Sequence, residues 1–575
     1  MAADLAPAAP ATTAPGRRGW RPGASATVLP GVVVFALFVL VPFGLLAFYS
    51  LLTSGTFVAS QPLTVDAYRR AIESPLTGEF ALNALRIGLP TALLTIVLAL
   101  PVACWLRYSA RRMLAPVLFL VTATIFASYL VRVYAWRTML GDQGVVNGVL
   151  EGIGVTDEPL GFLLFNRFSV TLGLTHWLLP LAVLMLYGAF RPLEAGYIEA
   201  ARDLGARTVG VWRRVVLPAI AAPLATTFLL MFVIASSDWL TPLLLGGGKD
   251  PTLGQRIQEE FKQLGDYPAG AALSLLMLVA FALLYAVLAL GLRGARLDKL
   301  HWTDAAPGAP RPSRPAGIAT GVVLAFLYVP LLVVVLFSFH STPSLSLPFE
   351  GFSLRWYEQL FADEVAVTTL RTSLLVASVT ALISLVLGTL TAYGLTRARR
   401  RLHGPLRVLF LLPLALPPLF VGLALFTLFV ELGVQLSLQT VVIAHVVVTL
   451  PLFVLIAGAT LDRLDPALDD AAQDLGAGGW QTFRHVTLPQ VWPALVAGAA
   501  LAFALSFDEF PVTFFVMGED STLPFYVYGR LRQTIDPLIN AISTLLMTVM
   551  FLLFALATLV EWLNARRRGS RATEL

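Results

Sequence analysis

Twelve long apolar runs dominate this sequence and restrict the folds open to it. A helix needs about 20 mostly apolar residues to cross the hydrocarbon core of a bilayer. Only 13% of the residues are charged, whereas soluble proteins carry about 25%. The sequence therefore predicts an all-α membrane protein with about 12 transmembrane helices. The runs form two sets of six: 27–53, 82–104, 113–136, 168–190, 219–242 and 270–292, and then 317–339, 369–395, 405–428, 437–460, 490–516 and 538–563.

A charged and then Pro/Gly-rich segment separates the two sets and predicts the domain organisation. We expect transmembrane domains at 27–293 and 317–563, joined by a cytoplasmic linker at 294–316. Residues 1–26 and 564–575 are expected to be cytoplasmic tails, the first of them disordered. The first apolar run is too long for the core of a signal peptide, so we expect it to be retained as a span.

Clusters of arginine predict the orientation in the membrane. They precede the first span at Arg17, Arg18 and Arg21, and they recur at 107–112, 293–314, 397–401 and 566–568. These loops would lie on one side, and basic loops favour the cytoplasm. Both termini are therefore predicted to be cytoplasmic. Because the arginines flank apolar runs, the net charge of +5 does not indicate a nucleic-acid surface.

A polar segment occurs twice. "EAARDLGARTVGVWRRVVLP" fills 199–218 and "DAAQDLGAGGWQTFRHVTLP" fills 470–489, with ten of the 20 positions identical at an offset of 271. Each copy follows the fourth span of its set, so both would face the cytoplasm. The two sets are therefore predicted to be parallel repeats, related by an axis along the membrane normal.

Each copy predicts a helix, a sharp turn and a second helix. Acidic residues near the start suit the helix dipole, and Gly205 and Gly476 suit the turn. The second piece would lead to Pro218 or Pro489, where the next span begins. Such an elbow can transmit motion from a cytoplasmic partner into the membrane. The alternative is an ordinary amphipathic loop at the interface, which the repetition in register disfavours.

This spacing resembles the EAA loop of importer-type ABC transporter permeases, which docks into ATP-binding subunits. The matches are Glu199, Ala200, Ala201, Gly205, Leu217 and Pro218, while Asp470 replaces the usual Glu, and Val215 and Val486 replace the usual Ile. The resemblance implies a type I ABC importer fold in a bacterial cytoplasmic membrane. It implies ATPase docking by Glu199, Ala200, Ala201, Asp203 and Gly205, and by Asp470, Ala471, Ala472, Asp474 and Gly476.

The same resemblance implies the partners and the division of labour. Two ATP-binding cassette subunits would dock on the two loops, and an extracytoplasmic binding protein would deliver the substrate. The chain would be a transport subunit rather than an enzyme, with no cofactor of its own, because its partner ATPase would bind ATP and Mg. "LGGGKDP" (245–251) is not a P-loop, since Asp250 replaces the Ser/Thr, and we expect an outer turn there.

Further stretches resemble one group of these importers. Segments 128–150 and 236–261 resemble the B-type membrane subunit of spermidine/putrescine importers, and the stretches at 412–425, 444–454 and 505–547 resemble the C-type subunit. The resemblance implies a fused permease for polyamines or a related amine-bearing solute. Ferric iron, thiamine and aminoethylphosphonate importers remain alternatives. A major-facilitator-type secondary transporter is the alternative from another class, although the polar repeat after span four disfavours it.

Three acids inside apolar runs are candidates for the substrate pathway. Asp238 and Asp508 follow the two loops at matched positions, and Glu509 adds a third carboxylate. Carboxylates within a membrane usually face a polar pathway, and these would suit a cation. Trp239, Tyr134 and Trp136 would add cation–π contacts. Alternatively, the acids are structural, paired with Arg132 or Arg371 or capping helix ends, and the aromatic residues mark the membrane interface.

Other reactive residues predict no chemistry of their own. His445 lies within an apolar span and is expected to pack or hydrogen-bond rather than bind a ligand. Cys104 is the single cysteine, so the chain cannot form an internal disulfide or a thiolate metal cluster. No catalytic dyad or metal-ligand spacing appears in the sequence.

Overall fold

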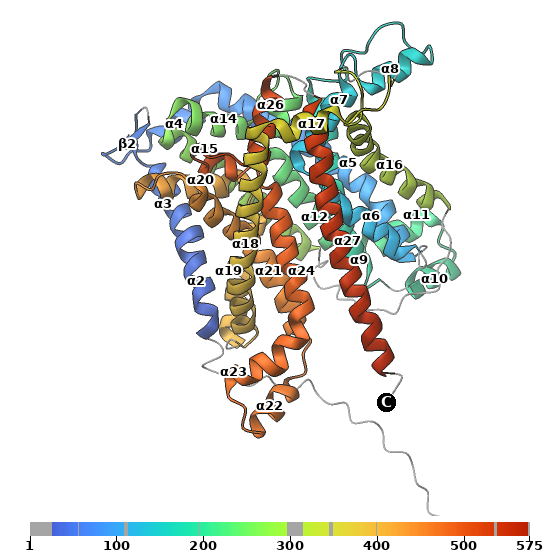
Figure 1. Ribbon diagram of the computed structural model, residues 1–575, viewed down its shortest axis with the longest axis vertical. Coiled ribbons are helices and arrows are strands. Elements are labelled where there is room, and N and C mark those ends of the chain that lie inside the picture. The colour runs from blue at the N-terminus through green and yellow to red at the C-terminus, as the bar shows by residue number, and fades with distance from the viewer. Residues whose placement is uncertain are drawn as a thin grey trace, which may run out of the picture.

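The computed structural model describes residues 26–55, 57–108, 113–193, 195–295, 314–343, 349–397, 400–533 and 537–572. These parts are almost entirely helical, apart from one short hairpin of β1 (Thr53–Gly55) and β2 (Val58–Ser60). The predicted tail up to residue 25 and the linker from 296 to 313 lie outside the described residues. Figure 1 shows the helices running mostly along one direction, as expected for a bundle that crosses a membrane.

Ten helices among the described residues are long and apolar enough to span a bilayer, or twelve spans if two bent pairs are included. This confirms the predicted fold class. The ten are Ala26–Tyr49, Pro75–Tyr108, Arg167–Phe190, Thr208–Ser237, Tyr267–Gly294, Arg314–Phe337, Glu364–Thr396, Leu438–Leu461, Gly479–Asp508 and Leu538–Leu556.

The first half contains the elements up to α15, and some spans combine several of them. They are η1 (Ala26–Val28), α2 (Leu29–Phe35), η2 (Ala36–Leu40), α3 (Val41–Tyr49), α4 (Asp66–Glu73), α5 (Pro75–Tyr108), α6 (Leu114–Ile125), α7 (Tyr129–Leu140), α8 (Val145–Gly152), α9 (Arg167–Phe190), α10 (Ala195–Asp203), α11 (Thr208–Val211), η3 (Trp212–Val216), α12 (Leu217–Ser237), α13 (Leu240–Leu245), α14 (Leu253–Glu259), η4 (Glu260–Leu264) and α15 (Tyr267–Gly294).

The second half repeats this order with fewer short elements. It comprises α16 (Arg314–Phe337), α17 (Arg355–Ala362), α18 (Glu364–Thr396), α19 (Arg400–Ala415), α20 (Pro418–Glu431), α21 (Leu438–Leu461), α22 (Pro466–Asp474), α23 (Gly479–Thr482), η6 (Phe483–Thr487), α24 (Leu488–Asp508), α25 (Thr513–Val516), α26 (Leu523–Gln533) and α27 (Leu538–Ala572). The last helix continues past residue 563, where the tail was expected to begin.

The third and ninth predicted spans are not straight. The chain bends by 91° between α6 and the segment Tyr129–Gly152, and by 102° between α19 and α20. The second bend falls at Pro417, whose extended ψ of 141° stops the helix because a residue before another proline disfavours helical backbone. The first bend falls at Ser128, which is also extended. A continuous apolar run contains no periodic signal that would reveal such a bend.

The repeat is exact in register over the centre of each half. α9 and α21 have 24 residues each and start 271 positions apart, after the capping residues Asn166 and Ser437. Ser169 Oγ donates to Leu245 O (2.9 Å), and Thr440 Oγ1 donates to Val516 O (2.7 Å) at the corresponding positions. The two halves therefore share the same local structure and not only the same sequence motif.

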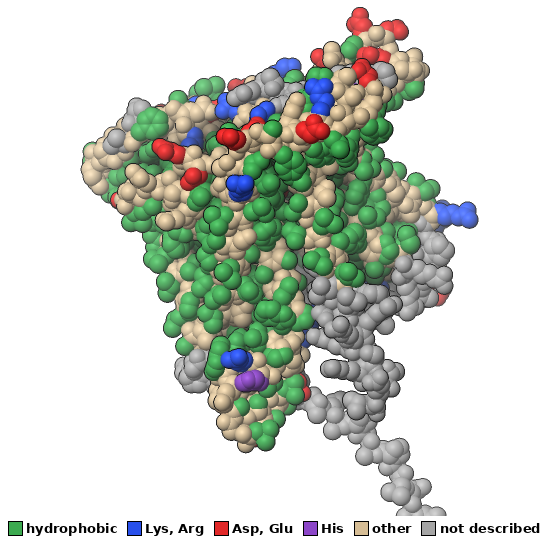
Figure 2. Space-filling view, in the orientation of Figure 1, with side chains coloured by type: hydrophobic (Ala, Val, Ile, Leu, Met, Phe, Trp, Pro, Cys, Tyr) green, Lys and Arg blue, Asp and Glu red, His purple; other side chains and the backbone are tan. Residues whose placement is uncertain are grey.

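The first span of each half packs on the opposite half. α2 and α3 contact α18 and α20, whereas α16 contacts α5 and α7. Tyr49 on α3 donates a hydrogen bond to Glu431 on α20 (2.6 Å), and the His176 ring on α9 is hydrogen-bonded to Leu327 O on α16 (3.0 Å). This exchange interlocks the halves. Figure 2 shows apolar side chains over the middle of the bundle, with most charges toward the end that carries α4 and α17.

Candidate functional site

The two polar repeats fold into elbows with the same backbone. In the first, Ala206 N–H donates to Ala201 O (3.0 Å), and in the second, Ala477 N–H donates to Ala472 O (3.0 Å). These bonds close a Schellman-type turn, which needs a left-handed residue just after the helix. Gly205 has φ +83° and Gly476 has φ +87°. The predicted helix–turn–helix, with glycine at the turn, is therefore confirmed in both copies.

The predicted docking residues lie mostly on the open surface of these elbows. Glu199, Ala200, Asp203 and Gly205 are exposed, as are Asp470, Ala471, Asp474 and Gly476 at the corresponding positions. Ala201 and Ala472 are half-buried, and their carbonyl oxygens accept the hydrogen bonds that close the turns. The structure contains no partner chain, so their role in docking stays a prediction.

Sequence reasoning missed the apolar tips of the elbows. Leu204 is 90% exposed and Leu475 is 89% exposed, although both are large apolar residues. Val209 and Trp480, which correspond to one another, are also exposed. Because exposed apolar patches mark interaction surfaces, we add these positions to the predicted docking surface. The identity of Leu204 and Leu475 within the repeat was the available signal.

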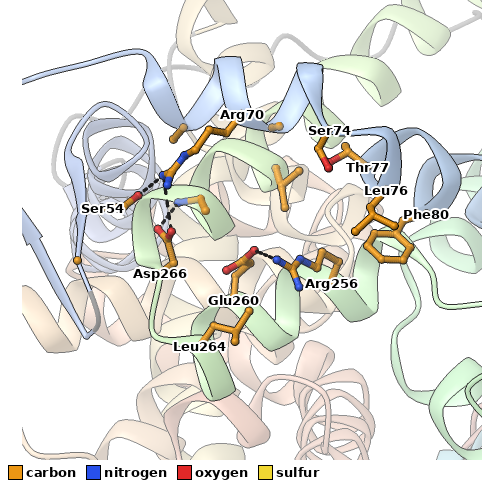
Figure 3. Close-up of a pocket in the computed structure, with 15 residues that line it drawn as sticks. Ser54, Arg70, Ser74, Leu76, Thr77, Phe80, Arg256, Glu260, Leu264 and Asp266 are labelled. Carbon is orange, nitrogen blue, oxygen red and sulfur yellow. Dashed lines mark hydrogen bonds and ion pairs between the residues drawn. The ribbon is translucent and has the colours of Figure 1, made fainter.

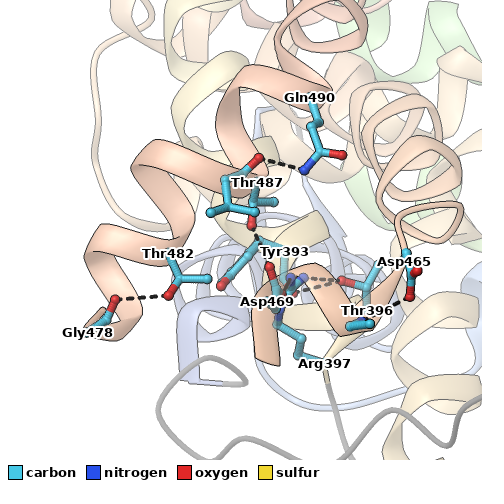
Figure 4. Close-up of polar contacts among 11 residues, drawn as sticks. Tyr393, Thr396, Arg397, Asp465, Asp469, Gly478, Thr482, Thr487 and Gln490 are labelled. Atoms are coloured by element: carbon cyan, nitrogen blue, oxygen red, sulfur yellow. Dashed lines mark hydrogen bonds and ion pairs between the residues drawn. The ribbon is translucent and has the colours of Figure 1, made fainter. Parts of the chain in front are cut away.

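The second elbow is held to the end of α18 by an ion pair (Figure 4). Arg397 donates to Asp469 Oδ2 (2.7 Å) and its guanidinium lies 3.7 Å from the centroid of the Tyr393 ring. Thr487 Oγ1 donates to the other oxygen of Asp469 (3.2 Å). Residue 198 is the counterpart of Asp469 at the repeat offset and is an isoleucine, so the first elbow has no equivalent ion pair.

In the first half, backbone carbonyls of the segment that leads into the elbow make the corresponding contacts. Arg107 Nε donates to Phe190 O (3.2 Å), and Tyr108 Oη donates to Leu193 O (3.1 Å). Both sets of contacts therefore start from the C-terminal end of the second span of their half, α5 or α18. Within the predicted basic loops at 107–112 and 397–401, the side-chain contacts that the structure describes are those of Arg107, Tyr108 and Arg397.

The second arm of each elbow continues into the next span without a break. Thr208–Ser237 and Gly479–Asp508 are helices of 30 residues each. Each contains a π-helical turn, η3 or η6, just before its Leu-Pro pair, where Leu217 N–H bonds back to Trp212 O. Pro218 therefore lies inside one continuous helix rather than at the start of a new one, and the point where that helix enters the membrane stays a prediction. The helix continues there because proline is tolerated where its missing N–H is not required.

The ends of these two helices carry the candidate acids. Asp238 Oδ2 accepts from Thr241 N–H (2.8 Å), and Glu509 Oε1 accepts from Val512 N–H (2.9 Å). Because these partners correspond at the repeat offset, Asp238 matches Glu509. The predicted match of Asp238 with Asp508 was wrong by one residue, since Ser237 is the counterpart of Asp508.

A single residue joins acids from both halves. Tyr129, the first residue of α7, donates through its hydroxyl to Asp238 Oδ1 (2.6 Å) and through its backbone N–H to Asp508 Oδ2 (3.1 Å). Helix capping, one of the structural alternatives for these acids, is thus observed. The ion-pair alternative is not, because within the described parts neither Arg132 nor Arg371 has a carboxylate oxygen within 4 Å.

The aromatic candidates separate into two places. Trp239, only 2% exposed, packs on Phe514 (4.6 Å between ring centroids) and Phe510 (6.2 Å) of the second half. Trp136 instead packs on His176 and Phe326, against α9 and α16. Tyr134 is fully buried on α7. The structure therefore groups Trp239 with the acids and places Trp136 in a separate ring cluster.

A cavity of about 530 Å³ opens at the end of the first half that carries α4, between α4, α5, α14 and α15 (Figure 3). Its charged residues already pair with one another: Arg256 contacts Glu260 (2.6 Å) and Arg70 contacts Asp266 (3.6 Å). Burial raises the pKa of Glu260, while Arg256 opposes this shift. Sequence reasoning missed this cavity, because its lining comes from elements that are far apart in the chain.

Two minor predictions are confirmed. His445 is buried and hydrogen-bonds Ser506 and Thr513, both at 2.7 Å. Residues 245–251 form a turn, with positive φ at Gly247 and Gly248. In the parts of the chain that the structure describes, no group of three or more His, Cys, Asp or Glu residues is placed to hold a metal ion.

Comparison with known proteins agrees with this architecture. The chain is 34% identical over 230 residues to the putrescine transport system permease protein PotI of Escherichia coli K12, covering 39% of this chain and 82% of that protein. It is 30% identical over 244 residues to the spermidine/putrescine permease PotC of Haemophilus influenzae (42% and 95%), and 31% identical over 224 residues to PotB of Escherichia coli K12 (39% and 81%).

Each of these relatives corresponds to about two-fifths of the chain, in keeping with two permease units in one polypeptide. The profile of the binding-protein-dependent transport system inner membrane components matches twice, at 88–293 and 384–569. The chain therefore belongs to this family of ABC importer permeases, as a multi-pass membrane transport subunit that contains the family's domain twice.

Proposed function

We propose that this chain supplies both membrane halves of an ATP-driven importer for polyamines or a related amine-bearing solute. The carrying observation is the pair of elbows, which have the same left-handed glycine turn and the same exposed leucine at the tip. A chain with two such elbows offers two equivalent docking places. Two ATP-binding cassette subunits bind them, and ATP hydrolysis takes place in those subunits.

The elbows couple ATP hydrolysis to the pathway through the two 30-residue helices. When the ATPase subunits approach one another, each elbow moves with the helix that continues from it. The far ends of these helices carry Asp238 and Asp508, which meet at Tyr129. Movement of one helix against the other alters this junction between the halves. A binding protein on the outer side delivers the substrate to it.

The polyamine assignment is supported by the names of the relatives and by the chemistry at this junction. PotI, PotC and PotB are permeases for putrescine or for spermidine and putrescine. Here three carboxylates and the Trp239 ring lie at the ends of facing helices, which suits ammonium groups. Ferric iron, thiamine and aminoethylphosphonate are the other outcomes of a substrate test. Family membership in the ABC permeases removes the major-facilitator alternative.

Two measurements test the proposal. Native mass spectrometry of the complex purified with its ATPase should show two ATPase copies per permease chain, and one copy would contradict the two-elbow account. Uptake into proteoliposomes loaded with ATP and supplied with the binding protein should transport putrescine or spermidine. Transport of thiamine or ferric iron in their place would overturn the substrate assignment. The permease without the ATPase should hydrolyse no ATP.

A further inference from the structure

A lysine of the first half inserts its ammonium group between aromatic rings of the second half. Lys262, on η4, donates from Nζ to Phe515 O (3.0 Å). The same nitrogen lies 4.7 Å from the centroid of the Phe426 ring and 5.9 Å from those of Phe514 and Phe515. Three ring faces and one carbonyl oxygen therefore surround a primary ammonium group.

No carboxylate of the described residues lies within 4 Å of this ammonium. It is held by cation–π attraction, which is worth up to about 2 kcal/mol when the cation is desolvated, and by one hydrogen bond. Burial lowers the pKa of Lys262 to about 8, so the surroundings do not fully compensate the charge. A cation held in this way can be exchanged for another more easily than one in a buried ion pair.

The residue type is unusual for this chain. Lysine occurs only at 249, 262 and 299 among 40 basic residues, so arginine is used almost everywhere else. Guanidinium and ammonium groups are not interchangeable, because the guanidinium is planar and the ammonium is compact. A chain that uses arginine elsewhere has at this position the same primary ammonium group that ends a polyamine.

The cage adjoins the acids described above. Phe514 and Phe515 contact Lys262 on one side and the Trp239 ring on the other, at 4.6 and 6.2 Å between ring centroids. Trp239 follows Asp238 directly in the chain. Its indole N–H is buried and has no hydrogen-bond partner in the structure. One layer of rings therefore separates the lysine from the junction of the two halves.

We propose that the cage of Phe426, Phe514 and the Phe515 carbonyl is a binding site for a primary alkylammonium group, which the chain's own Lys262 occupies until a substrate ammonium displaces it. This inference rests on the proposed function and adds a specific amine subsite to it. Lys262 acts as a tethered competitor. It also links the halves while no substrate is present, since its main chain belongs to the first half and the cage to the second.

The test uses the assembled complex, with its ATPase subunits, in nanodiscs. Lys262→Met removes the ammonium but keeps the length of the side chain, and Lys249→Met is the matched control on an exposed lysine of the outer turn. In the Lys262→Met complex, n-butylammonium at millimolar concentration should raise the thermal unfolding midpoint, whereas n-butanol should not. Wild type and Lys249→Met should need about fivefold or more butylammonium for the same shift, because Lys262 competes for the cage. Absence of a butylammonium effect on Lys262→Met overturns the proposal.

Uptake gives an independent readout. Lys262→Met should lower the KM for putrescine about fivefold or more, because the competitor that occupies the site is gone. Lys262→Arg, which keeps a cation, should not lower it, and it provides the comparison if Lys262→Met assembles poorly. An unchanged KM in Lys262→Met counts against displacement. If wild type transports no polyamine, the substrate assignment fails, while the butylammonium experiment still decides whether the cage binds ammonium.

Discussion

The anchor of the second elbow gives the sharpest quantitative prediction, because the first elbow provides an internal control. Asp469→Ala removes the carboxylate that pairs with Arg397, and Ile198→Ala changes the corresponding residue of the first elbow, which has no ion pair. The side chains of Arg397 and Asp469 are only 12% and 13% exposed. Solvent therefore screens this pair less than an ordinary surface ion pair.

The size of the effect follows from what the carboxylate holds. It accepts from Arg397 and from Thr487, so its loss leaves a half-buried guanidinium without its charged partner. Hydrogen bonds to charged groups are worth about 1.5–3 kcal/mol. At 1.4 kcal/mol per factor of ten, an elbow released from α18 should bind its ATPase about 10- to 100-fold more weakly.

The assay is a titration of ATPase subunits onto the permease in nanodiscs, followed by mass photometry. Asp469→Ala should leave one strong and one weakened site, so that a complex with a single ATPase accumulates. Ile198→Ala should change the affinity of either site less than threefold. The exchange Arg397→Asp with Asp469→Arg should recover part of the loss. Equal weakening of both sites, or no weakening in Asp469→Ala, would refute the anchoring argument.

Three further outcomes are expected. Gly205→Ala and Gly476→Ala should each weaken ATPase association by about 1–2 kcal/mol through left-handed strain alone, since no atom lies within 4 Å of the added Cβ, whereas Gly479→Ala in the same elbow should not; binding titrations compare them. Asp508→Asn keeps an oxygen for the Tyr129 N–H but loses the charge, so polyamine uptake should fall about tenfold or more at unchanged membrane abundance; normal uptake would remove Asp508 from the pathway. Burial alone would raise the pKa of Asp363, but hydrogen bonds from Tyr526 and the Ala366 N–H, and the charge of Arg530, hold it below its ordinary value. This depressed pKa stabilises the protein above the ordinary pKa of aspartate, about 4, and the contribution is lost as pH falls through the folded pKa; thermal melts of wild type between pH 3 and 7 should show a steeper loss than those of Asp363→Asn.

The parts of this protein that sequence predicted well are those that local chemistry determines. Twenty-residue apolar runs give spans, and the repeated Asp-Leu-Gly-Ala gives the same turn at Gly205 and Gly476 because only glycine adopts that backbone at little cost. The Pro417-Pro418 pair was the available signal for the second bend, whereas hydropathy gave none for the bend at Ser128, because an apolar run can cross the membrane or turn within it. Hydropathy measures what surrounds a helix and not its direction.

The candidate site, like the fold, was predictable from the sequence only in part. Asp238, Asp508 and Trp239 were recognisable as unusual residues for an apolar run, yet their partners could not be read from the sequence. Tyr129 and Lys262 became part of the site only because the fold brings them across the interface between the halves. The prediction that Asp238 corresponds to Asp508 was wrong by one position, because it matched the residue type and not the position at the repeat offset. The repeat offset of 271, applied strictly, assigns Glu509 as the counterpart.

In each half, one long helix joins the polar elbow to the distant acid. A helix of 30 residues is about 45 Å long, whereas the hydrocarbon core is about 30 Å thick. The excess of about 15 Å is long enough for the elbow's second arm to lie outside the bilayer, as predicted, while the other end of the helix carries the acid. Under the proposed function, a displacement of the turn at Gly205 or Gly476 reaches Asp238 or Asp508 through the single helix that follows the turn. Tyr129 bonds to an acid at the end of each helix, so we expect relative movement of the two helices to break or exchange a hydrogen bond there. Tyr129→Phe would keep the backbone bond to Asp508 and remove the hydroxyl bonds to Asp238 and Thr241. It should therefore alter the coupling between ATP hydrolysis and uptake while leaving ATPase association unchanged. Measurement of transported solute per ATP in proteoliposomes decides this, and an unchanged ratio would show that the junction is a passive contact.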